Sequence, residues 1–64
     1  MREELALYTP EQTGEILKMA TQTLAKWRMT GEGPRFLKFG NRIRYTEKDL
    51  LAYINDNTKQ HTGQ

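Results

Sequence analysis

Two long polar side chains, Gln22 and Lys26, stand four residues apart in the segment 21–27. In a helix this spacing places both on one face, and the apolar residues Leu24 and Trp27, with Ala20 one turn earlier, form an opposite stripe that should be buried. A glutamine can pair bidentately with adenine, and a lysine can reach guanine acceptors or a phosphate, when a helix lies in a DNA major groove. The pattern predicts a recognition helix with these candidate contacts: Thr21, Gln22, Thr23, Ala25 and Lys26.

Positive charge is concentrated in the middle of the chain. Residues 21–45 hold six basic side chains and one acidic one, a local charge of +5, whereas the other residues carry −3 and the whole chain +2. Cations gathered on one side of a protein suit a phosphate backbone, because binding releases condensed counterions. A solvated surface of mixed charge is the alternative interpretation. The clustering favours an anionic partner.

Five further candidate DNA contacts are not on the outer face of that helix. Arg28 sits nearer its rim, where a phosphate is the expected target. Arg42 is the candidate for insertion into the minor groove, with Lys38 and Arg44 on the backbone. Asn41 either adds an amide contact or supplies the positive φ of a turn.

Composition excludes several classes of protein. At 64 residues the chain is one small domain, without cysteine and with one histidine, His61, in a polar tail. We therefore expect no metal, no cofactor and no small-molecule ligand. There is no nucleophile–base pair, paired carboxylate site or phosphate loop, so an enzyme is not expected. Because no apolar run approaches the roughly 20 residues of a membrane span, we expect a soluble intracellular protein and no membrane partner.

Two short helices are predicted before the basic centre. Thr9 can cap the first, with Pro10 at its first position and Gln12 completing a capping box, and this helix should run to about Lys18. Its expected buried face is Thr13, Ile16 and Leu17. The second helix should run from about residue 21 to 29. With about three residues between them, the helices must cross sharply, and Gly14 should permit their close approach, which describes a helix-turn-helix.

Residues 35–45 alternate as a β-hairpin with two possible registers. A two-residue loop, Gly40-Asn41, mixes apolar and charged side chains on each face. A three-residue loop, 40–42, gathers Leu37, Phe39, Ile43 and Tyr45 on one apolar face and leaves Lys38 and Arg44 on a basic one. Since a one-residue slip inverts every side chain, the segregated pattern favours the three-residue loop.

A third helix should follow the hairpin. Thr46 is its expected cap, Tyr45 and Leu50 can form a hydrophobic staple, and the apolar stripe extends to about Asn57. We expect residues 1–57 to form one domain and residues 58–64 to be a disordered polar tail. The predicted fold class is mainly α with a small β-hairpin, a winged helix-turn-helix in which the hairpin is the wing.

Over roughly residues 5–55 the sequence resembles the small excisionase-type helix-turn-helix domains, which are related to the DNA-binding domains of MerR-type regulators. The resemblance rests on LYTPEQ (7–12), TLAKW (23–27), GEGP (31–34), FGNR (39–42) and YTEKDL (45–50). Ala20 departs from it, because the family usually has a serine cap there.

This resemblance implies a recombination directionality factor of a phage or mobile element. Such a protein binds repeated sites in attachment DNA, bends the duplex, and directs a site-specific integrase toward excision. The expected partners are therefore double-stranded DNA with attachment-site repeats, an integrase, and further copies of the same protein bound cooperatively on the DNA. The expected location is the cytoplasm of a bacterial host, in association with the nucleoid.

Three alternatives remain open. A small transcriptional regulator of the same fold would carry the same features, and the DNA-binding subunit of a packaging terminase is usually longer. A protein–protein adaptor would use Met29, Phe36 and Leu37 as a docking patch. Steep loss of DNA affinity with salt would separate the DNA-binding classes from the adaptor.

Overall fold

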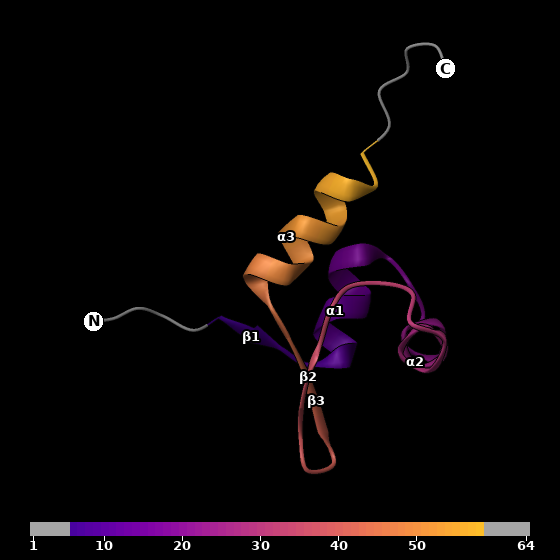
Figure 1. Cartoon of the computed structure of the whole chain (residues 1–64), viewed down its shortest axis with the longest axis vertical. Coiled ribbons are helices and arrows are strands. Elements are labelled where there is room, and N and C mark those ends of the chain that lie inside the picture. Colours follow the sequence, from indigo (N-terminus) through magenta and orange to yellow (C-terminus); the bar gives the residue numbers. More distant parts are fainter. Residues whose placement is uncertain (1–5, 59–64) are drawn as a thin grey trace, which may run out of the picture.

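Short helices and short strands make up most of residues 6–58, the part of the chain that the computed structural model describes (Figure 1). In chain order they are β1 (Leu7–Tyr8), α1 (Pro10–Leu17), α2 (Thr21–Thr30), β2 (Leu37–Phe39), β3 (Arg42–Thr46) and α3 (Glu47–Asp56). This order confirms the predicted winged helix-turn-helix. The predicted disordered tail, apart from Thr58, and the first five residues of the predicted domain lie outside the described residues.

The start of α1 is fixed by the predicted capping box. The Thr9 hydroxyl accepts a hydrogen bond of 3.1 Å from the backbone N–H of Gln12, and the Gln12 side chain accepts one of 2.9 Å from the backbone N–H of Thr9. Pro10 occupies the first turn, where a missing N–H has no cost. The helix ends at Leu17, and Lys18 follows in the left-handed region with φ of 59°.

Gly14 allows the turn between α1 and α2 to pack closely. A Cβ at this position would lie 2.7 Å from the carbonyl oxygen of Met19 and 3.8 Å from a methyl group of Leu24, which confirms the predicted close approach. Ala20 is the N-cap of α2 and makes no side-chain capping bond. Its predicted burial is wrong: Ala20 is exposed, because a cap with extended backbone stands outside the helical stripe.

The core is small, and its buried side chains come from α1, α2, β3 and α3. Leu24, Tyr45 and Leu50 are its buried hydrophobic residues. Trp27 is half-buried, with its ring centroid 5.9 Å from that of Tyr53 on α3. Ile16 is exposed, contrary to prediction. The buried residues of α1 are Thr13 and Gly14, so α1 packs on α2 and β3 through a narrow strip that does not reach Ile16.

The three strands form an antiparallel sheet with order β1-β3-β2. In the wing, Phe39 pairs with Arg42 and Leu37 with Arg44, so the loop has two residues and the predicted three-residue register is wrong. Gly40 has φ of 60°, and a glycine with positive φ at the first loop position is what a two-residue II′ turn requires.

The register leaves Leu37 and Phe39 on the sheet face opposite the buried Tyr45, where they are 38% and 53% exposed. Phe36, which the three-residue register would place on the basic face with Lys38 and Arg44, instead lies with its ring centroid 6.3 Å from that of Tyr45. Segregated faces would be favoured if the residues of β2 were packed on one side against another layer. All three residues of β2 are exposed, on both faces of the strand, so burial does not select the register of the wing.

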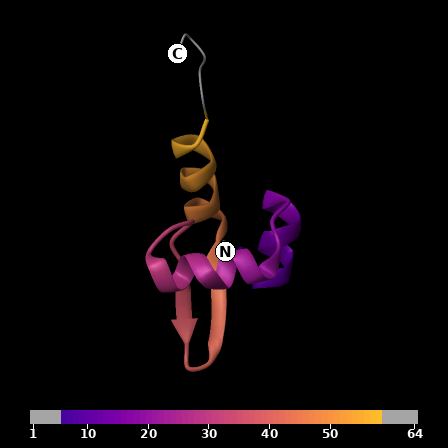
Figure 2. The ribbon, with the colours of Figure 1, turned by 90° about the vertical axis from the view of Figure 1, so that its right-hand side faces the viewer.

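The last helix begins where the sheet ends. Thr46 closes β3, pairs with Leu7 of β1, and accepts a hydrogen bond of 3.0 Å from the N–H of Asp49 as the predicted cap of α3. In both views α3 and the tip of the wing point to opposite ends of the molecule, with α2 beside the hairpin between them (Figures 1 and 2). Among the described residues, no helix has both the length and the apolar character needed to cross a membrane.

Candidate nucleic-acid interface

The outer face of α2 presents three long side chains to solvent. Gln22 and Lys26 are exposed, as the sequence predicts, and Leu24 is fully buried on the opposite side. At 100° per residue Met29 falls on the same stripe as Gln22 and Lys26, and it is 87% exposed. The stripe therefore combines an amide, a cation and a thioether, with nothing else in residues 6–58 covering it.

Smaller side chains border this stripe. Thr21 is exposed at the start of α2, and Thr23 and Ala25 are half-buried on its flanks. The methyl group of Ala25 lies between the outer stripe and the flank that carries Arg28. Ala25 precedes Arg28 by three residues and Met29, on the outer stripe, by four, so it neighbours both on the helix surface. A small residue there lets the helix approach another surface closely. Gln22, Ala25 and Lys26 thus share one side of α2, and Thr21 and Thr23 lie on its two flanks.

Arg28 has a different setting from the other predicted contacts. Its Nη1 donates a hydrogen bond of 2.7 Å to the hydroxyl of Tyr45, and its Cζ lies 5.9 Å from the ring centroid of Phe36. The side chain is half-buried. It therefore joins α2 to the base of the wing, a role that sequence reasoning missed because it depends on a contact 17 residues away along the chain.

The wing carries its cations on both faces. The two-residue register puts Lys38 on the face of Ile43 and Tyr45, and Arg42 and Arg44 on the other face. Lys38 and Arg42 are exposed, and Arg44 is half-buried and donates a hydrogen bond of 2.6 Å to the carbonyl oxygen of Ile43. The expected single basic face is thus replaced by a ribbon with a cation on either side.

Asn41 occupies the tip of the wing. It is exposed, and the positive φ of the loop belongs to Gly40. Of the two roles left open for Asn41, that of supplying a positive φ is therefore excluded. An amide at this position is free to contact a ligand.

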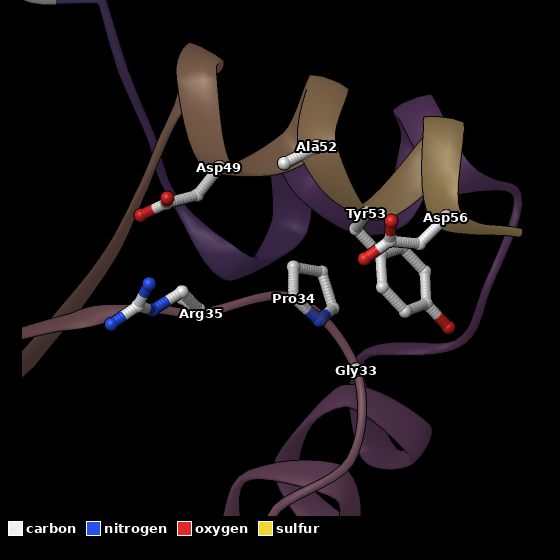
Figure 3. A pocket seen from close by; sticks show the side chains of 7 residues that line it. All are labelled: Gly33, Pro34, Arg35, Asp49, Ala52, Tyr53 and Asp56. Carbon is white, nitrogen blue, oxygen red and sulfur yellow. The ribbon is translucent and has the colours of Figure 1, made fainter.

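The opposite end of the molecule is acidic. A small pocket of about 90 Å³ lies between α3 and residues 33–35. Asp49 and Asp56 stand along its α3 side, and Arg35 and Tyr53 complete the polar part of its lining (Figure 3). Two carboxylates repel phosphate, so this end is unsuited to a nucleic acid. The polar face of α2 and the cationic wing are the surface that suits one.

Comparison with known proteins agrees with this geometry. A family model described as a helix-turn-helix domain matches residues 7–58. The chain belongs to the helix-turn-helix domain family. No curated protein and no solved structure matches it. Membership supports binding of double-stranded DNA by this helix-turn-helix domain, whose second helix is the one that carries the outer stripe of Gln22, Lys26 and Met29.

Met29 is the contact candidate that sequence reasoning missed on the helix itself. The signal was present, since Met29 follows Lys26 by three residues and Gln22 by seven, which is one helical stripe. From the sequence, Met29 was considered only as part of an adaptor docking patch, because an apolar side chain is not an obvious DNA contact. The residues considered as the docking patch of an adaptor do not form one surface, because Phe36 and Leu37 point to opposite faces of the wing.

Proposed function

We propose that this helix-turn-helix domain is a sequence-specific DNA-binding and DNA-bending protein, and that it acts as an excisionase. In this role it directs the site-specific integrase of a phage or mobile element toward excision. The observation that carries the DNA-binding part is the exposed polar stripe of α2 beside a wing with cations on both faces. The excision role is supported by the resemblance of five sequence segments to excisionase-type domains.

The helix supplies the proposed sequence readout. Gln22 pairs with an adenine, and Lys26 reaches guanine acceptors or a phosphate. Thr21 and Thr23 offer hydroxyl groups to the backbone, and Ala25 permits close approach to the groove floor. Met29 adds an apolar surface that fits the methyl group of a thymine.

The wing supplies the proposed bending. Arg42, exposed beside the loop, enters the adjacent minor groove, and Asn41 adds an amide contact there. Because Lys38 and Arg44 leave opposite faces of the ribbon, they can neutralise the two phosphate strands that border the groove. Neutralising and clamping both strands at one position favours curvature of the duplex.

The first experiment selects duplexes from a random-sequence pool with the wild-type protein. Affinity for the selected duplex is then measured against salt concentration. We expect log Kd to depend steeply on log salt, with a slope of about 0.9 for each phosphate that the protein neutralises. Failure to enrich any sequence, or an affinity insensitive to salt, would refute sequence-specific DNA binding.

Matched variants assign the contacts. Gln22→Ala and Lys26→Ala should each weaken specific binding by roughly 1–3 kcal/mol. Lys48→Ala removes an exposed lysine from α3, at the acidic end, and should leave binding unchanged. Unchanged affinity for both helix variants would remove α2 from the readout.

The bending and excision parts need their own assays. Arg42→Ala should reduce the bend, measured from gel mobility of permuted sites, more than it changes sequence preference, whereas Arg35→Ala, an exposed arginine beside the acidic pocket, should not. Footprints on the attachment region of the parent element, with and without its integrase, test the excision role. Protection confined to a promoter, with no effect on recombination, would favour a transcriptional regulator instead.

A further inference from the structure

Arg28 is held on the inner side of the α2–wing junction by two aromatic residues. The Tyr45 side chain, 1% exposed, presents its hydroxyl to Arg28 Nη1 at 2.7 Å, and the ring of Phe36 lies beneath the guanidinium at 5.9 Å. The rings of Phe36 and Tyr45 are themselves 6.3 Å apart. One side chain of the helix thus contacts β3 and the residue that precedes β2.

The buried hydroxyl of Tyr45 favours the inward orientation of the Arg28 side chain. A buried polar group without a partner is costly, and Arg28 supplies the hydrogen bond that the Tyr45 hydroxyl makes within residues 6–58. A guanidinium is planar and rigid, so it can donate to the hydroxyl and stack on an aromatic ring at the same time. Turning Arg28 outward to a phosphate would break both contacts and leave the hydroxyl unpaired.

Neighbouring residues of α2 therefore bind two different parts of the molecule. Trp27 packs on Tyr53 of α3, and Arg28 binds the base of the wing. The wing has few other attachments to α2, since the element contacts of β2 and β3 are mainly with each other, with β1, with α1 and with α3. α1 packs on both α2 and β3, and the hydrogen bond from Arg28 to Tyr45 adds a direct side-chain connection between α2 and the base of the wing.

We propose that Arg28 is a positioning residue, which sets the angle between α2 and the wing through Tyr45 and Phe36 and does not neutralise a phosphate. This inference rests on the proposed DNA contact by both elements. It assigns Tyr45 and Phe36 a part in DNA bending, because the angle between helix and wing decides where the second contact falls on the duplex.

The test compares three variants on the duplex selected by the wild-type protein. Tyr45→Phe removes the hydroxyl and keeps the ring, Arg28→Met removes the charge and keeps the length, and Lys26→Met is the matched loss of an exposed cation. The measurements are the bend angle and the slope of log Kd against log salt. Far-UV circular dichroism confirms that each variant is folded.

The expected results distinguish a positioning role of Arg28 from neutralisation of a phosphate by its charge. Arg28→Met and Tyr45→Phe should both reduce the bend, and the double variant should reduce it no further, while the salt slope stays at the wild-type value. Lys26→Met should lower the slope by about 1. A slope lowered by about 1 in Arg28→Met, with Tyr45→Phe behaving as wild type, would overturn the proposal and make Arg28 a phosphate contact.

A measurement without DNA keeps this test independent of the proposed function. Residual dipolar couplings of the free protein report the orientation of the wing relative to α2. We expect that orientation to change in both Arg28→Met and Tyr45→Phe. An unchanged orientation in both folded variants would refute the positioning role, whereas failure of the wild-type protein to select any duplex would refute only the proposed function.

Discussion

Replacing Gly33 by alanine tests how the loop between α2 and the wing is held. Gly33 has φ of +80°, and an added Cβ would lie 2.5 Å from Cε3 and 3.1 Å from Cβ of Trp27. Real Cβ atoms do not approach a carbon this closely. Either the indole ring or the loop must therefore move, and the ring is packed against Tyr53.

The cost has two parts. A left-handed conformation costs an alanine roughly 1–2 kcal/mol. Displacing a packed side chain by an overlapping methyl group costs about 1–3 kcal/mol more. A single core of this size supplies roughly 3–5 kcal/mol in total, so Gly33→Ala should leave the domain close to its unfolding midpoint at room temperature.

Gly31→Ala is the control that isolates the steric part. Gly31 has a similar φ of +85° in the same loop, but an added Cβ there would meet nothing within 4 Å. Urea denaturation followed by circular dichroism measures the free energy of unfolding of both variants. We expect Gly33→Ala to lose about 1–3 kcal/mol more than Gly31→Ala. Equal losses would show that the packing of Gly33 on Trp27 is not a constraint.

Three further changes have defined outcomes. Ala20→Ser should raise the free energy of unfolding by about 1 kcal/mol, measured by urea denaturation, because it gives α2 the capping side chain it lacks; no gain would mean that another group already satisfies the cap. Thr13→Val should also stabilise, by about 1 kcal/mol in the same assay, since the buried Thr13 hydroxyl has no hydrogen-bond partner among residues 6–58; a loss would reveal one. Met29→Ala should abolish the affinity difference between the selected duplex and its thymine-to-uracil form, measured by titration, and a difference that persists would exclude the methyl contact.

Local signals were enough to predict most of the helical framework. The capping box of Thr9 and Gln12, and the cap at Thr46, each depend on residues within one turn, so the sequence specifies them without knowledge of the rest of the fold. The outer face of α2 follows in the same way from the spacing of Gln22, Lys26 and Leu24.

The features that were missed depend on long-range packing. Both hairpin registers satisfy the local pattern, and the choice between them required knowing that β2 is exposed on both faces. The hydrogen bond that Arg28 makes could be predicted only by knowing that Tyr45 lies beside it in space. The face on which Lys38 lies follows from the register, so that part of the candidate site could not be placed before the sheet was known.

Thr46 connects three parts of the molecule that the sequence keeps separate. It ends the central strand, pairs with Leu7 of β1 and caps α3, and the next residue, Glu47, donates its backbone N–H to the carbonyl oxygen of Ala6 at 3.1 Å. Mechanical force applied to the tip of the wing therefore passes along β3 into the first turn of α3 without crossing a flexible joint. If the duplex is bent as we propose, the load on the wing is shared between this junction and the hydrogen bond of Arg28 to Tyr45.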